Sequence, residues 1–210
     1  MIAATENSNT SVLRQTRCTA FEGSKCIVSG KLADVASMAK EVIDKNQDAQ
    51  ILIFDDITGE LIEVDFRGTV EDVLNRLVET TNQELLDSPS LPSKSEPARG
   101  PGRPKLGVVA REVTLLPRHW VWLNDQPGGA SVALRKLVEE AKRANAAKDQ
   151  VRHSREACYR FIFAMAGNLP GFEEATRALF AGDQKRFDEN VQSWPVDIRT
   201  HATRLATVAS

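Results

Sequence analysis

The chain has 210 residues, of which 41% are hydrophobic and 27% charged, proportions that suit a globular protein with a packed core. No apolar run approaches the length of a membrane-spanning helix, and residues 1–17 lack the apolar stretch of a signal peptide, so we expect a cytoplasmic protein without a membrane segment. Three cysteines without a C-x-x-C pair and three scattered histidines predict no disulfide framework, no metal site and no cofactor.

The charge is distributed unevenly, although the net value is only −2. Residues 88–155 hold 13 Lys and Arg against 6 Asp and Glu, a net +7, whereas residues 1–87 hold 8 against 16, a net −8. A basic block between acidic or neutral blocks indicates a segment that binds a polyanion.

The first part of the chain is predicted to be a disordered tail, residues 1–17, followed by a small α+β domain, residues 18–87. Short β-prone runs at 18–22 and 25–29 are followed by helical apolar spacing over 31–45. Two further strand patterns, 50–55 and 61–66, flank a turn with Gly59, and Thr69 begins a capped helix. The predicted order is therefore ββαββα.

Residues 88–106 are predicted to be a Pro-rich basic linker, because five of the nine prolines lie between residues 88 and 107. The last part of the chain, 151–210, is predicted to be a helical domain. Its apolar residues recur at helical spacing, Gly182 ends one helix, and Pro195 fits the first turn of the last one.

Between them, residues 107–150 are predicted to form a strand-helix-helix module. Arg111–Leu115 alternates as a strand does, and Pro117 opens a short helix that ends at Pro127-Gly128-Gly129. Ser131 can cap the next helix. The apolar face of that helix comprises Leu134, Leu137, Val138 and Ala141.

This order of elements resembles the ribbon-helix-helix DNA-binding family over about 38 residues. The resemblance implies a homodimer or larger assembly, in which two strands pair into a β-ribbon that enters the major groove. It places Arg111 and Thr114 on the ribbon and Ser131 at a helix N-terminus that meets a phosphate. In the family, the core leucine before the proline alternates in step with the other inward-facing strand residues. Leu116-Pro117 does not, so which strand residues face the groove stays undecided. The alternative is a plain β-α-α segment that packs into a larger domain.

Just upstream, Gly102-Arg103-Pro104-Lys105 resembles the core of an AT-hook, which lies in the minor groove of A·T-rich DNA. The match is partial, because Pro101 stands where the motif has an arginine. The resemblance implies DNA contacts by Arg99, Arg103 and Lys105, and the alternative is a merely basic linker.

The chain also resembles an uncharacterised bacterial family of unknown function, chiefly over GRPKLGVVAREVTLLPRHW (102–120) and PGFEEATRALFAGD (170–183). No catalytic motif is present, and Asp55-Asp56 suits a turn as well as it suits a Mg²⁺ site. The sequence therefore predicts a DNA-binding, non-enzymatic transcriptional regulator, with DNA and a second copy of the chain as partners and no effector indicated. The alternative is a protein–protein adaptor whose basic segment docks an acidic partner.

Overall fold

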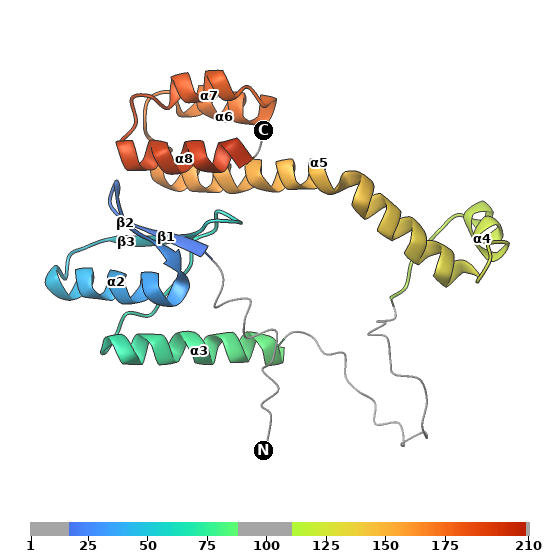
Figure 1. The fold of residues 1–210 in the computed structure, drawn as a ribbon, viewed down its shortest axis with the longest axis horizontal. Helices are drawn as coiled ribbons and strands as arrows, with labels where there is room; N and C mark the ends of the chain where they lie inside the picture. The colour runs from blue at the N-terminus through green and yellow to red at the C-terminus, as the bar shows by residue number, and fades with distance from the viewer. Residues whose placement is uncertain (1–16, 88–110, 209–210) are drawn as a thin grey trace, which may run out of the picture. The chain divides into compact units, whose positions relative to one another are not determined.

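The computed structural model describes residues 17–87 and 111–208, which fold into three strands and seven helices (Figure 1). The elements are β1 (Arg17–Glu22), β2 (Lys25–Lys31), α2 (Leu32–Lys45), β3 (Ile51–Asp55), α3 (Val70–Asp87), α4 (Pro117–Asn124), α5 (Ala130–Ala166), α6 (Phe172–Ala181), α7 (Gln184–Asn190) and α8 (Val196–Val208). The fold is thus mixed α+β and mostly helical. Its contacts divide the chain into two compact units, one that joins the N-terminal residues up to 89 to residues 148–210, and one of residues 90–147. The predicted domain boundaries stay predictions.

The sheet of the first unit has the order β2-β1-β3, with both pairs antiparallel. The β1–β2 hairpin turns at Gly23, whose φ of 56° suits glycine. A register shift between Ala20 and Phe21 marks a bulge in the hairpin. Because the strand order is β2-β1-β3, β1 is the central strand, and its residues Cys18–Phe21 are fully buried.

Each face of this sheet contributes side chains to a different hydrophobic cluster. Cys18, Ala20 and Ile53 pack against Val35 and Ala39 of α2. The side chains of Phe21 and Phe54 instead belong to the larger cluster built from α5 to α8. Figure 1 shows this layering, with α2 on one side of the sheet and α5 and α8 on the other. Central β1 therefore lacks the alternation of buried and exposed residues that a half-solvated strand has.

The strand predicted at 61–66 is wrong. Leu61 makes a single bridge to Phe54, and the Ile62 amide donates to the Ile53 carbonyl at 2.8 Å, but no further ladder forms. The Arg76 side chain donates to the carbonyl oxygens of Asp65 and Arg67 at the end of this segment. Among the described residues the N-terminal order is therefore ββαβα.

The predicted helix starts are confirmed in most places. Thr69 and Asp72 form a reciprocal capping box, in which each backbone amide donates to the other's side chain, at 2.9 and 3.2 Å. The short helix opened by Pro117 is α4. The helices predicted from Ser131 and around Ala157 are, however, one continuous helix, α5, which begins at Ala130. Ser131 thus lies inside the first turn rather than at the cap.

Candidate functional site

The predicted site residues fall in two groups. Arg99, Arg103 and Lys105 lie outside the described residues. Arg111, Thr114 and Ser131 are described, and all three are exposed to solvent.

The strand predicted at Arg111–Leu115 is not formed in the single chain. The segment is without regular secondary structure, and no hydrogen bond is recorded for its backbone within the described part of the chain. Val113 is exposed and Leu115 half-buried. An exposed segment without secondary structure is accessible to another chain.

Two helices follow this segment, joined by a tight glycine turn. Gly128 and Gly129 have φ values of 89° and 74°, and the Gly129 amide donates to the Gln126 carbonyl at 2.8 Å. A Cβ on Gly128 would lie 3.1 Å from the Val132 side chain. The two predicted helices and the glycine turn between them are therefore present without the predicted strand, and the positive φ values favour glycine at both positions of the turn.

Basic side chains lie near the start of α5. The Arg135 guanidinium donates from Nε to the carbonyl of Ser131 at 3.0 Å, which holds its charge one turn from the helix N-terminus. The unpaired amides of a helix N-terminus favour an anion, and a neighbouring cation adds to that preference. The sequence interpretation missed Arg135, although its spacing of four residues from Ser131 was a usable signal.

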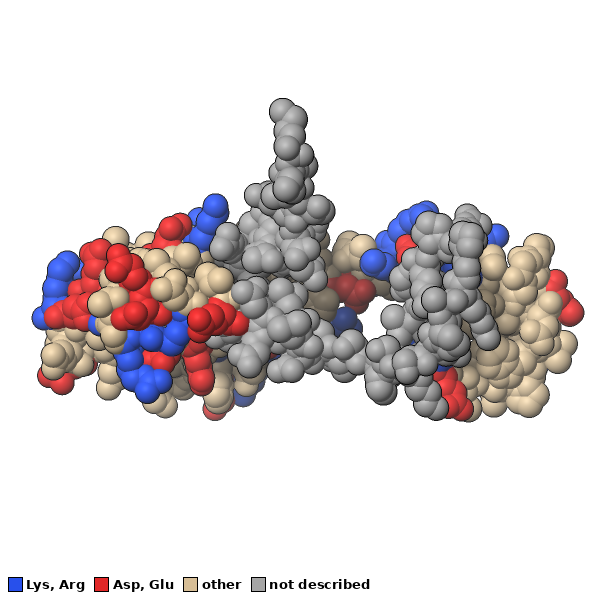
Figure 2. Space-filling model, turned by 90° about the horizontal axis from the view of Figure 1, so that it is seen from below, with Lys and Arg blue, Asp and Glu red and all other residues tan. Residues whose placement is uncertain are grey.

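Several large apolar side chains among residues 111–147 are exposed. The buried apolar side chains in this range are Leu123 and Ala133. The exposed ones include Leu116, Trp120, Val121, Trp122, Leu137 and Val138. Leu137 and Val138 were predicted to be core residues and are not covered in the described chain. Figure 2 shows the surface around α4, at the right of the view, with few charged side chains.

The first unit contains a buried polar network that the sequence did not reveal. Asp56 Oδ1 accepts a hydrogen bond from Thr19 Oγ1 at 2.7 Å. The Thr19 hydroxyl is 2.8 Å from Ser29 Oγ; because Thr19 donates to Asp56, Ser29 must be the donor in this pair. Arg204 and Arg17 approach Asp56 Oδ2 at 3.0 and 3.5 Å. These are ion pairs rather than well-directed hydrogen bonds, since Oδ2 has no hydrogen-bond partner.

His201 lies beside this network and is only 6% exposed. Its Nδ1 is 3.1 Å from the Arg204 guanidinium, which can only donate, so Nδ1 accepts and the ring is neutral. Burial lowers the pKa of His201 from 6.5 to about 4; Arg204 acts in the same direction and Asp56 in the opposite one. The rings of Phe161 and Phe21 lie 4.4 and 5.4 Å from the imidazole.

The Asp55-Asp56 pair does not form a metal centre in the described chain. Asp55 Oδ1 accepts from the amides of Ile57 and Thr58 at 2.7 and 2.8 Å, as a turn aspartate does. Asp56 is committed to the network above. Among the described residues no group of three or more His, Cys, Asp or Glu side chains is placed to hold a metal ion.

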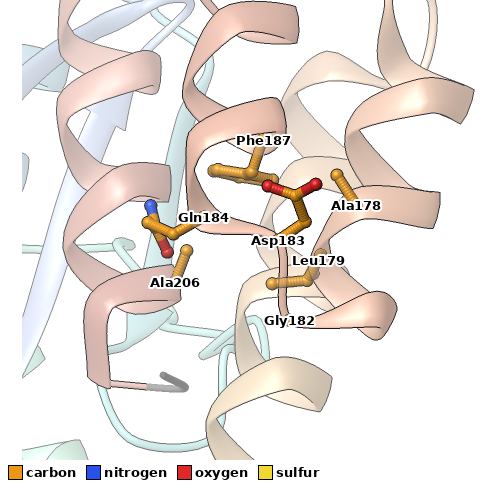
Figure 3. A pocket seen from close by; sticks show the side chains of 7 residues that line it. All are labelled: Ala178, Leu179, Gly182, Asp183, Gln184, Phe187 and Ala206. Carbon is orange, nitrogen blue, oxygen red and sulfur yellow. The ribbon is translucent and has the colours of Figure 1, made fainter.

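Two hollows in the described surface differ greatly in volume. The one between α6, α7 and α8, lined by residues such as Leu179, Asp183 and Phe187, has a volume of about 10 Å³ (Figure 3). That volume is at the lower limit for one water molecule. A wider groove of about 560 Å³ lies over α3 and the loop before it, with Glu63, Asp65, Arg76 and Glu79 in its lining. Asp65 is ion-paired with Arg67 and Arg76, so the carboxylate is not left for a ligand.

The fold and these surfaces define a mixed α+β protein with an exposed basic and apolar helix pair. None of its described helices has both the length and the apolar character needed to cross a membrane. A family model described as "Uncharacterized protein conserved in bacteria (DUF2239)" matches residues 17–206. The chain belongs to this family. Neither the curated proteins nor the solved structures contain a significant match to it.

Proposed function

We propose that this protein is a non-catalytic DNA-binding protein of the cytoplasm, acting as a transcriptional regulator through its basic middle third. The observation that supports the proposal is the segment 111–115, exposed for the most part and without regular secondary structure, which leads directly into two helices joined by a glycine turn. In the ribbon-helix-helix arrangement, two such segments pair across a dimer and enter the major groove.

The proposed contacts follow from the chemistry of each position. Thr114 reads base edges from the ribbon, with Arg111 beside it. Ser131 and Arg135 receive a phosphate at the start of α5, where helix dipole and cation act together. Arg103, flanked by Arg99 and Lys105, supplies an AT-hook-like arm for the minor groove.

A second candidate function is a protein–protein adaptor whose basic segment docks an acidic partner. The exposed tryptophans, Trp120 and Trp122, favour it, because exposed aromatic side chains are common at the centres of protein interfaces. Salt dependence separates the two candidates. On duplex DNA, log K falls by about 0.9 per phosphate contact for each decade of salt.

The test is fluorescence anisotropy of the full chain on random duplex DNA and on a duplex selected from bound genomic fragments, at several salt concentrations. Arg103→Ala is expected to weaken binding to both and to reduce the salt slope by about one contact. Thr114→Ala is expected to reduce the preference for the selected duplex, by about 1–3 kcal/mol for a lost base contact.

Lys45→Ala is the matched control, because it removes one exposed cation from the acidic part of the chain, where Lys45 pairs with Glu41. It should bind like the parent. If folded Arg103→Ala and Thr114→Ala also bind like the parent, the DNA proposal fails and the adaptor function replaces it.

A further inference from the structure

Four aromatic side chains form a row along α5 and α6, within the first unit. In order of contact they are Phe172, Phe163, Tyr159 and Phe180, with successive ring centroids 6.3, 5.9 and 5.7 Å apart. Phe163 is 62% and Phe180 49% exposed, whereas Tyr159 and Phe172 are half-buried against the core. This aromatic row is therefore an apolar surface in contact with solvent.

The core of the unit does not need the two exposed rings. Ile162 and Leu179, the chain neighbours of Phe163 and Phe180, are the residues that these turns of α5 and α6 bury in the large cluster. Consecutive residues of a helix differ in direction by about 100°, so the phenylalanines point away from that cluster. Single exposed apolar residues are common, whereas contiguous exposed ones mark a contact surface.

The size of the aromatic row suits a short segment better than a second folded copy. Phe172 and Phe180 are eight residues apart on α6, which corresponds to about 12 Å along the helix axis. The two exposed rings offer roughly 200 Å² of surface. A stable interface between folded proteins takes about 800 Å² from each partner.

The charges around the aromatic row are balanced within the chain. On α6, Arg177 pairs with Glu173 at 3.4 Å, and on α5, Arg160 lies 3.8 Å from Glu60. Residues 155 and 156, one turn before the row, are one cation and one anion. A nucleic acid or an acidic peptide would find no matching surplus of charge here, so an uncharged segment is favoured.

The row also has one hydrogen-bond donor to offer. The Tyr159 hydroxyl has no hydrogen-bond partner in the described part of the chain, and a half-buried phenol normally finds one. A proline-rich segment meets each of these requirements. Its rings pack on aromatic faces, its carbonyls accept, and proline has no N–H that would need an acceptor.

We infer that the aromatic row binds a proline-rich segment of another protein, uncharged at its centre and held as a polyproline II helix. Four residues of such a helix span about 12 Å, the length of the row. The inference concerns a surface of the first unit and does not depend on DNA binding by the second.

The test begins with the full chain on an array of decapeptides with a Pro-x-x-Pro core, in which both x positions run through all amino acids. A second array carries alanine in place of both prolines. The tightest decapeptide, labelled with fluorescein, is then titrated by anisotropy against Phe163→Ala, Phe180→Ala and Tyr159→Phe. Val196→Ala is the matched control, because Val196 is also 62% exposed but lies on α8, outside the row. Circular dichroism checks that each variant is folded.

The parent chain is expected to bind the proline array and not the alanine array. Each phenylalanine variant should raise the dissociation constant by about tenfold, as loss of a central aromatic contact does. Tyr159→Phe keeps the ring and loses the donor, so it should raise the constant by about threefold. Val196→Ala should bind like the parent, and binding should change little between about 50 and 500 mM salt, since no ion pair is involved.

Three results would overturn the inference: no binding to the proline array, equal binding to the alanine array, or a folded Phe163→Ala variant that binds like the parent. Sedimentation equilibrium covers the remaining occupant. If the parent chain is a dimer and Phe163→Ala is a monomer, a second copy covers the row and the inference is likewise wrong.

Discussion

Acid should destabilise this protein in a pH range set by one buried histidine. The His201 imidazole is held neutral by burial and by the neighbouring Arg204, with its pKa lowered from 6.5 to about 4. In the unfolded chain the same group takes up its proton near pH 6.5. The unfolded state therefore binds more protons between these values, and the folded state loses stability as the pH falls from about 6.5 to 4.

The magnitude follows from the size of this shift. Each pKa unit corresponds to about 1.4 kcal/mol, so the full loss is about 3 kcal/mol, reached below pH 4. A domain with 5–15 kcal/mol of total stability would show such a loss readily. Asp65 and Asp72 also have lowered pKa values, the first mainly through Arg67 and the second through Thr69. Their stabilisation is lost when the carboxylates protonate, at pH values below the window of His201.

Urea unfolding between pH 7 and 4.5, followed by circular dichroism, measures this effect. His201→Phe retains a ring against Phe21 and Phe161 and cannot titrate, so its stability should change little across the window. Arg204 loses the His201 acceptor but keeps its ion pair with Asp56 at 3.0 Å, and its side chain is 42% exposed. His153→Phe removes an exposed histidine and should keep the parent's slope. An equal slope in His201→Phe and the parent would refute the reasoning.

Two smaller predictions concern the same unit. Gly59→Ala should destabilise the chain by more than about 2 kcal/mol in urea unfolding, because the position has a φ of 68° and an added Cβ would lie 2.1 Å from the Ala157 carbonyl oxygen. Alkylation of the native protein, read by peptide mapping, should modify half-buried Cys26 first. Burial raises the pKa of both Cys18 and Cys158 to about 12, which leaves almost no thiolate at neutral pH, so early labelling of either would contradict this.

Local signals in the sequence were enough to find most of the elements. The helix starts at Thr69 and Pro117 depend on neighbouring residues, and each forms as expected. The strand at 61–66 failed for a non-local reason. Its alternating pattern was real, but pairing with β3 stops after the bridge at Leu61, and the Asp65 carbonyl accepts from Arg76 of the following helix.

The length of α5 shows a different limit. Two apolar patterns, around Leu137 and Phe161, were interpreted as separate helices because the residues between them are polar and alanine-rich. Alanine, lysine and arginine favour the helix whether or not they are buried, and neither glycine nor proline interrupts the chain from 130 to 166. The helix propensities of these residues therefore indicated one continuous helix. The apolar periodicity indicated only the segments that were expected to pack.

The network around Asp56 could not have been predicted, since Arg17, Asp56 and Arg204 come from three distant parts of the sequence. The sheet and α8 bring them together, and the Cys26 amide adds a second polar link by donating to Asp197 of α8 at 2.9 Å. Apolar packing alone tolerates a helix sliding along a sheet, whereas a buried carboxylate and the cations that pair with it favour one alignment. The network therefore favours one position of α8 on the sheet, and His201 of the same helix lies beside Asp56. The site proposed for DNA and the element most sensitive to acid thus belong to different units of the chain.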